Sequence, residues 1–382
     1  MSVTTARRAT EQSVTAYQNL IGGGWQPASD GRTLDMISPS DGQAFARIAR
    51  GTKADIDAAV RAARHAFEAG AWGKLTAVER GRLMTKLGEA ILVNHEELSL
   101  LEARDCGKPM KQARADITAA ARYFEYYGGA ADKYHGDTIP FLDGYMVTIL
   151  REPKGVTGHI IPWNYPAQMF GRSLAPALAM GNAVVMKPAE DACVTPVRLA
   201  QLAQEVGFAP GALNVVTGIG EEAGAALASH PGIDFLSFTG SPEVGTLVQK
   251  AAAENHIGCT LELGGKSPQI VFEDADFDAA VPVVVNAIVQ NGGQPRAGAK
   301  IHLRQVRRAG GCALQAIARG KPCYGPGLRP SHFCQSEQAR ARLHRSGEEG
   351  RHSGACAGAN RRRRAGRRFL CCAGAIRPGA PR

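Results

Sequence analysis

Apolar residues recur with a helical period over the first third of the chain. In residues 52–70 they lie three or four positions apart, which places them on one helix face; they are Ile56, Val60, Ala63 and Phe67. Thr52 and Asp55 have the spacing of a capping box, which predicts that this helix begins at Thr52. A second helix start is predicted at Thr76 with Glu79, followed by a long one-sided apolar pattern over 82–104, and a Lys-Pro pair separates this helix from a further predicted one.

The period changes near residue 134. Residues 134–152 hold two short strand-like stretches around a Leu-Asp-Gly turn, which predicts a two-stranded hairpin. From residue 155 onward, short apolar stretches alternate with helical patterns; the predicted strands are VTGHII, AVVMKP, ALNVVTG, IDFLSFTG and CTLELGG. Repeated strand–helix units predict an α/β fold, namely a Rossmann-type parallel sheet with helices on both faces. Such sheets bind ligands at the carboxyl ends of their strands.

Composition divides the chain at residue 295. The formal net charge is +10, but residues 295–382 hold 20 Lys and Arg against three Glu and no Asp, whereas residues 1–294 hold 25 basic and 32 acidic residues. The tail has no sustained periodicity and is dominated by Gly, Ala, Pro and Arg, so we expect it to be disordered. Arginine clusters bind phosphates, but this one lacks interleaved aromatic residues, so nucleic acid is not the expected partner.

Length and apolar content narrow the class of protein. The 382 residues suffice for two or three domains. No apolar run approaches the roughly 20 residues that span a bilayer, and the first residues lack the apolar core of a signal peptide. We therefore expect a cytoplasmic protein without membrane contact. The nine cysteines then do not predict a disulfide framework, and the absence of repeated CxxC pairs argues against a metal site.

Two polar stretches follow the first two predicted parallel strands. In IPWNYP, the side-chain amide of Asn164 is suited to donate to an oxyanion, although a turn asparagine packed beside Trp163 is an equally simple interpretation. In KPAE, Lys187 and Glu190 are suited to hold the hydroxyls of a ribose. A surface ion pair is the alternative for these two residues.

Two further stretches follow the last two predicted strands. In FTGSPEVG, residues 238–245, the backbone N–H groups of a helix start suit a pyrophosphate, but helix–sheet packing explains such glycines as often. In LELGGKSP, Glu262 at a strand end is a candidate general base. It is also the kind of carboxylate that caps a neighbouring helix.

Taken together and in this order, these stretches resemble the NAD(P)-dependent aldehyde dehydrogenase superfamily over about residues 19–294, with IGGGW at 21–25 as a further match. The resemblance implies that an aldehyde is oxidised to a carboxylic acid. A cysteine thiolate attacks the aldehyde, hydride passes to the nicotinamide, and water cleaves the resulting thioester. It also implies a small aldehyde substrate, a homo-oligomer, and NAD in preference to NADP, because the Glu190 carboxylate disfavours a 2′-phosphate.

The same resemblance implies roles for individual residues. Asn164 matches the oxyanion donor, and Glu262 matches the carboxylate that activates the deacylating water. Lys187 and Glu190 match the residues that hold the adenosine ribose. The other implied cofactor positions are Ile160, Ile161, Pro162, Trp163, Ala189, Gly220, Gly224, Phe238, Thr239, Gly240, Ser241, Val244, Leu263 and Gly264.

The implied domains follow the family pattern up to residue 294. They are an NAD-binding domain over 1–133 and 151–262, an oligomerisation ribbon over 134–150, the start of a truncated catalytic domain over 263–294, and an Arg-rich tail outside the family over 295–382. The family's later Glu-x-Phe-Gly-Pro motif is absent from the sequence, as is the C-terminal strand that completes the dimer sheet.

The position of the nucleophile is the sharpest departure from the family. Gly293 and Gln294 lead up to it, but Arg296 stands where the cysteine belongs, and a guanidinium cannot form a thioester. We therefore predict an inactive chain. A reading frame lost between about residues 290 and 297, either in the gene or through a sequencing error, accounts for the composition of the tail. A non-catalytic NAD-binding protein with a nucleic-acid-binding tail is the alternative function.

Overall fold

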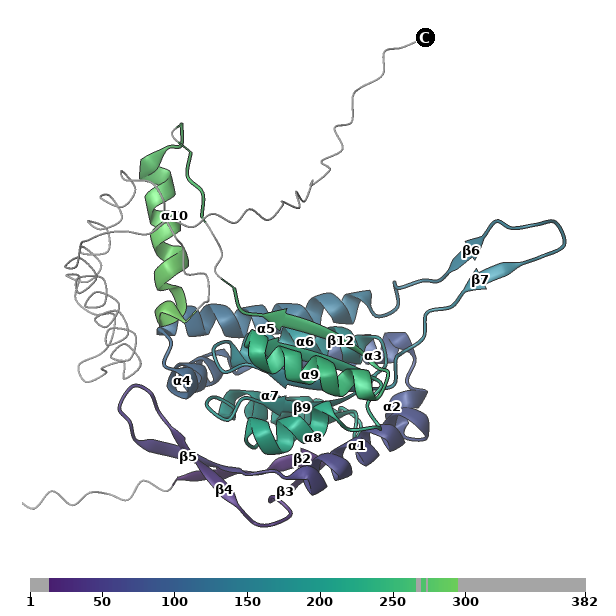
Figure 1. The fold of residues 1–382 in the computed structure, drawn as a ribbon, viewed down its shortest axis with the longest axis horizontal. Coiled ribbons are helices and arrows are strands. Elements are labelled where there is room, and N and C mark those ends of the chain that lie inside the picture. Colours follow the sequence, from purple (N-terminus) through teal and green to yellow (C-terminus); the bar gives the residue numbers. More distant parts are fainter. Residues whose placement is uncertain (1–13, 266–268, 273, 295–382) are drawn as a thin grey trace, which may run out of the picture. The chain divides into compact units, whose positions relative to one another are not determined.

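The computed structural model describes residues 14–265, 269–272 and 274–294, so Arg296 and the tail expected to be disordered lie outside the described residues. At the centre is a seven-stranded sheet of order β12-β11-β8-β9-β10-β2-β3 (Figure 1). Its strands are β2 (Asn19–Ile21), β3 (Gly24–Gln26), β8 (Val156–Ile161), β9 (Ala183–Pro188), β10 (Leu213–Val215), β11 (Phe235–Gly240) and β12 (Gly258–Leu263). The five strands from β8 to β12 are parallel, which confirms the predicted α/β sheet.

The N-terminal hairpin extends this sheet by two antiparallel strands that the sequence analysis did not predict. Strand β2 pairs with β10, and β3 pairs with β2, both antiparallel. Gly22 and Gly23 join β2 to β3 with φ angles of 61° and 86°. Two successive positive φ angles are what a type I′ hairpin turn requires, and glycine adopts them without steric strain.

Helices cover both faces of the sheet (Figure 1). One layer contains α3 (Ala77–Val93), α4 (His95–Cys106), α5 (Met110–Ala130), α6 (Pro166–Ala179) and α7 (Val194–Glu205). The other contains α1 (Lys53–Glu68), α8 (Ala225–Ala228) and α9 (Pro242–Glu254), with the short α2 (Ala71–Lys74) following α1. This arrangement confirms the prediction of helices on both faces.

The helix ends follow local side-chain chemistry. Thr52 caps α1 through a capping box with Asp55, as predicted. The single long helix predicted over 82–104 is wrong, because the chain makes two helices, α3 and α4, that meet at Asn94. Asn94 has φ −97° and ψ 22°, outside the helical range, and its side chain donates to the Ala90 carbonyl oxygen at 2.8 Å at the end of α3.

The core lies between the sheet and the two helical layers. All six residues of β9 are buried, which is expected of a central parallel strand covered on both faces. Ile56 of α1, Phe124 of α5 and Phe170 of α6 belong to the same fully buried cluster as Val185 of β9. Burying one such side chain stabilises the fold by about 1.5 to 3 kcal/mol, so these contacts fix the sheet and the strand ends that it presents.

The remaining elements lie at the margins. A three-stranded sheet contains β1 (Thr15–Tyr17), β5 (Ala44–Ala49) and β4 (Thr33–Ile37). The hairpin predicted over 134–152 is confirmed as the antiparallel pair β6 (Asp137–Ile139) and β7 (Val147–Ile149), which stands apart from the helical layers (Figure 1). The last described elements are α10 (Phe277–Val289) and the short helix η2 (Gln290–Gly293). Within the described part of the chain, no helix is long and apolar enough to cross a membrane.

Candidate functional site

The strand order reverses beside β8, and this reversal positions the candidate site. From β8 the chain adds β9 and β10 on one side, then returns to add β11 and β12 on the other side. In a parallel α/β sheet, such a switch point marks the ligand site at the carboxyl ends of the strands. The register places Lys187, Ile160, Phe238 and Leu261 in one row across four strands.

Lys187 and Glu190 form an ion pair at this edge. The Lys187 side chain is 2% exposed, and its Nζ lies 2.5 Å from Oε2 of Glu190, whose side chain is 32% exposed. The other carboxylate oxygen accepts a hydrogen bond from the Gly220 backbone N–H at 3.1 Å. Burial acts to raise the pKa of Glu190, but Lys187 and the backbone N–H groups of Glu190 and Gly220 together outweigh it, so the pKa is lowered and the carboxylate is ionised at neutral pH.

A glycine-bounded helical turn faces this pair. The turn η1 (Gly220–Gly224) is a single π-helical turn. A Cβ at Gly220 would meet no atom closer than Glu190 Oε1 at 3.9 Å, and a Cβ at Gly224 none closer than Lys187 Cδ at 3.9 Å. The backbone at Gly220 and Gly224 therefore carries no side chain beside the ion pair, which leaves room for a ligand to approach it closely.

The start of α9 lies next along the same edge. Ser241 caps the helix, with its Oγ accepting from the Val244 N–H at 3.3 Å, and Pro242 occupies the first turn. A Cβ at Gly240 would lie 2.5 Å from Phe238 Cζ, so the close packing of the Phe238 ring requires glycine there. The positive end of the helix dipole suits an anionic group at this point.

Asn164 lies against the last described turn of the chain. Asn291 donates from its Nδ2 to the Asn164 carbonyl oxygen at 2.8 Å, and the Asn164 Nδ2 lies 3.5 Å from the Gln294 carbonyl oxygen. Gln294 in turn donates to the Cys106 carbonyl oxygen at 2.8 Å. Asn291, Gly292 and Gly293 all have positive φ, so the backbone turns tightly here and brings Gln294 beside Asn164.

Glu262 lies at the end of β12, two strands away from the strand that leads to Asn164. Its side chain is 57% exposed, and its only ion pair among the described residues is a loose one with Arg172 of α6, at 3.9 Å. The structure therefore places Asn164 and Glu262 at the same edge of the sheet without a direct contact between them. The other predicted residues lie at the same strand ends: Ile160, Ile161, Pro162, Trp163, Ala189, Thr239, Leu263 and Gly264.

A buried charge cluster lies below Asn164, and the sequence analysis did not identify it. Lys108 Nζ lies 2.7 Å from Glu102 Oε1 and 2.5 Å from Asp116 Oδ2, and none of the three side chains is exposed. The ammonium also lies 4.8 Å from the ring centroid of Tyr165, the neighbour of Asn164. Burial acts to lower the pKa of Lys108, but the carboxylates outweigh it and the pKa is raised. Nothing in the sequence signals this cluster, because its members meet only in the folded chain.

Sequence comparison matches most of the chain to one known family. A sequence model described as "Aldehyde dehydrogenase family" matches residues 25–300. The chain is 46% identical over 283 residues to "Aldehyde dehydrogenase family 2 member B4, mitochondrial" of Arabidopsis thaliana, covering 74% of this chain and 53% of that protein. It is 45% identical to "Retinal dehydrogenase 2" of Homo sapiens, covering 74% of this chain and 55% of that protein. The chain thus spans about half the length of the curated relatives it matches.

Solved structures share the fold at substantial identity. A Burkholderia cenocepacia protein has a TM-score of 0.79 and 53% identity, covering 87% of this chain and 72% of that chain. The structure titled "NAD+ complex structure of aldehyde dehydrogenase from bacillus cereus" has a TM-score of 0.81 and 36% identity, covering 88% of this chain and 70% of that chain.

Proposed function

The chain belongs to the aldehyde dehydrogenase family, and from that premise we propose that it binds NAD at the carboxyl edge of the seven-stranded sheet. The observation that carries the proposal is the Lys187–Glu190 ion pair facing the bare backbone of η1. It supplies a hydrogen-bond donor and an acceptor beside an open surface, which suits the two adjacent hydroxyls of a ribose. The solved Bacillus cereus relative is an NAD+ complex.

Each group at the edge has a distinct proposed task. Lys187 donates to one ribose hydroxyl, and Glu190 accepts from the other. The first turn of α9, capped by Ser241, holds the pyrophosphate through backbone N–H groups. Because Glu190 is ionised, it repels a 2′-phosphate, and NAD is bound in preference to NADP. When bound, NAD supplies a hydride acceptor for the oxidation of an aldehyde.

Two further residues fit tasks on the substrate. The Asn164 side-chain amide is proposed as the donor to the carbonyl oxygen of an aldehyde. Glu262, exposed at the end of β12, is proposed as the base that activates water. The adjacent turn of Asn291 to Gln294 contacts Asn164 through hydrogen bonds, which supports the proposal that this turn belongs to the same site.

We propose that the chain nevertheless does not oxidise aldehydes, because the sequence has Arg296 where the family carries its nucleophilic cysteine. Of the three cysteines in the described part of the chain, Cys106 and Cys193 are buried. Burial raises the pKa of both thiols well above its usual range. Neither thiol therefore forms the thiolate that attack on an aldehyde requires.

The domain boundaries are part of the same proposal. Residues 1–133 and 151–262 would form the NAD-binding domain, residues 134–150 the oligomerisation ribbon, and residues 263–294 the start of the catalytic domain. Strands β6 and β7 fall inside the ribbon, and its large apolar side chains are exposed; they are Phe141, Leu142, Tyr145 and Met146. An exposed apolar ribbon of this kind suits contact with a second copy of the chain.

The test separates cofactor binding from turnover. The purified chain is titrated with NAD and with NADP in a calorimeter, and it is then incubated with NAD and a panel of aldehydes while NADH absorbance is followed. We expect binding of NAD, weaker binding of NADP, and no NADH. Replacing Glu190 with Gln should narrow the difference between the two cofactors. Sustained NADH formation that is lost in the Glu262→Gln variant would show that the chain is active after all.

A further inference from the structure

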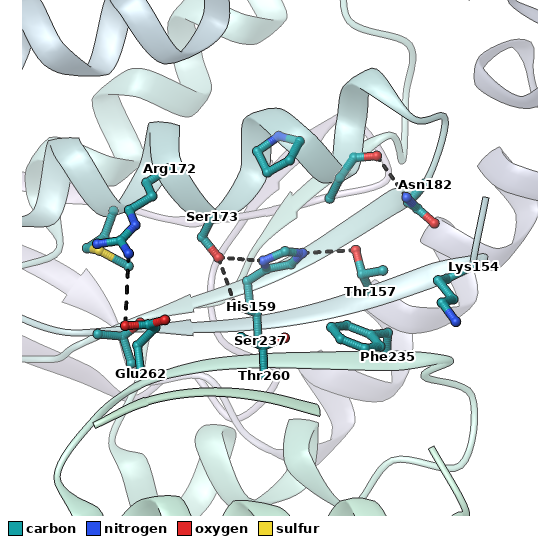
Figure 2. Close-up of a pocket in the computed structure, with 14 residues that line it drawn as sticks. Lys154, Thr157, His159, Arg172, Ser173, Asn182, Phe235, Ser237, Thr260 and Glu262 are labelled. Atoms are coloured by element: carbon teal, nitrogen blue, oxygen red, sulfur yellow. Dashed lines mark hydrogen bonds and ion pairs between the residues drawn. The ribbon is translucent and has the colours of Figure 1, made fainter. Parts of the chain in front are cut away.

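Two carboxylates at the carboxyl edge of the sheet differ in how firmly they are held. Glu262 has one loose contact, at 3.9 Å to Arg172 (Figure 2). Glu190 is held from two sides, by Lys187 Nζ at 2.5 Å and by the Gly220 backbone N–H at 3.1 Å. The position of the Glu190 carboxylate therefore depends on the position of the turn η1, which carries Gly220.

An ion pair joins this turn to the N-terminal part of the chain. Glu222 lies in the middle of η1, and its two carboxylate oxygens accept from Arg50, from Nε at 3.1 Å and from Nη2 at 2.9 Å. Both side chains are about one-third exposed. The Arg50 guanidinium lowers the pKa of Glu222, so the pair is ionised at neutral pH. A guanidinium that contacts both oxygens of a carboxylate also fixes its orientation.

The backbone beside Arg50 packs directly against the segment that leads into η1. The Gly51 N–H donates to the Thr217 carbonyl oxygen at 2.8 Å, and Thr217 Oγ1 donates to the Ala49 carbonyl oxygen at 2.7 Å. A Cβ at Gly51 would lie 2.6 Å from the Thr217 carbonyl oxygen, so the close approach of the two backbones requires glycine. Arg50 directly follows β5 and therefore reaches η1 from a fixed base in the three-stranded sheet.

We propose that Glu222 is a positioning residue of the proposed NAD site. Clamped by Arg50, it holds η1 so that the Gly220 N–H keeps the Glu190 carboxylate directed at the ribose. Without the clamp, the turn has to be ordered when NAD binds, and such ordering costs affinity. The inference rests on the proposed function. It gives the three-stranded sheet a part in cofactor binding, although that sheet contributes none of the residues proposed to contact NAD.

The test measures the order of the turn and the affinity for NAD separately. Amide hydrogen exchange of residues 219–224 is followed without cofactor, and the full chain is then titrated calorimetrically with NAD and with NADP. In Glu222→Gln and in Arg50→Gln we expect faster exchange and a smaller preference for NAD over NADP. The NAD affinity should fall by about three- to tenfold. Arg50→Lys, which keeps the charge without the planar fork, should lie between the unsubstituted chain and Arg50→Gln.

Each substitution has a matched control. Glu221→Gln removes the same charge from the same turn, but Glu221 is exposed and has no ion pair among the described residues. Arg47→Gln removes a positive charge from β5, where Arg47 pairs with Asp35 instead. Both controls should leave the exchange and the NAD affinity unchanged, and urea denaturation should show that every variant is folded.

The sign of the effects separates positioning from simple charge. Glu222→Gln removes a negative charge and Arg50→Gln a positive one, so a purely electrostatic influence on an anionic cofactor would change the affinity in opposite directions. That result would overturn the proposal, as would an unchanged NAD affinity in both variants or an equal loss in Glu221→Gln. A chain that binds no NAD would contradict the proposed function. The exchange measurement would then still decide whether Glu222 orders the turn, and unchanged exchange would overturn that assignment.

Discussion

The described part of the chain holds two buried lysines, and they lie in opposite kinds of surroundings. Lys108 is enclosed with Glu102 and Asp116, and no side chain of that cluster reaches solvent. Lys187 is almost as deeply buried, but its partner Glu190 is one-third exposed and faces the bare turn η1. Both lysines are paired with carboxylates. Only the second pair has an open side on which a ligand can displace water.

The difference in solvent access distinguishes the structural Lys108 cluster from the Lys187–Glu190 pair, which can bind a ligand. Taking charges out of water is costly, so an enclosed cluster persists only while every member is paired. At a half-open pair, a ligand provides hydrogen bonds in place of water. Burial of a lysine therefore does not by itself mark a site; the solvent access of its carboxylate partner does.

The largest effect on the free energy of unfolding is expected from Lys108→Met. This substitution leaves Glu102 and Asp116 in the core without a counter-ion, and breaking such a buried pair costs about 3 to 5 kcal/mol. Urea denaturation followed by circular dichroism measures the free energy of unfolding. Lys187→Met is the matched comparison and should cost clearly less, because water hydrates the half-open Glu190. Equal losses of unfolding free energy in the two variants would show that the Lys108 cluster and the Lys187–Glu190 pair do not differ in this way.

The second-largest effect on the free energy of unfolding is expected from Asp105, a buried residue close enough to Glu102 to interact with its charge. Its Oδ2 accepts from the Thr195 N–H at 3.0 Å, and burial raises its pKa to about 7. Between about pH 4 and pH 7 the folded chain keeps a proton that the unfolded chain has released, so the unfolding free energy falls as the pH rises through this window.

Asp105→Asn should remove that dependence. Between pH 5 and pH 8 the unfolding free energy of the variant should fall by about 2 to 3 kcal/mol less than that of the unsubstituted chain. Urea denaturation at both pH values measures the difference. Parallel pH profiles for the two proteins would mean that Asp105 is ionised in the fold throughout this range.

The smallest effect is expected from Lys187→Met, and it should appear in the affinity for NAD. Lys187→Met should lower the affinity for NAD by about tenfold, or about 1.4 kcal/mol, because one charge-assisted hydrogen bond to the ribose is lost. Calorimetric titration measures the affinity, and Lys154→Met serves as a control lysine outside the ribose site. An unchanged NAD affinity would show that Lys187, like Lys108, only stabilises the fold.

Local pattern was sufficient to predict much of the architecture. The stretch that became β9 was identifiable because a strand buried on both faces is mostly apolar. The stretches that became β8 and β11 were identifiable as short apolar segments that alternate with helical patterns. The capping box at Thr52 and the hairpin around residue 143 follow from contacts between near neighbours. The break at Asn94 was not predicted, because the apolar helical pattern continues through it and only the backbone angles of Asn94 depart from the helix.

The sequence by itself determined the fold class, the ion pair of Lys187 with Glu190, and the positions of Asn164 and Glu262 at strand ends, because each depends on residues close together in the chain. Only the tertiary structure decided that Lys108 meets Asp116, that Asn291 holds Asn164, and that Arg172 lies 3.9 Å from Glu262. These contacts join residues on separate elements. Their free energy depends on burial and distance, which the folded chain sets and a linear pattern does not contain.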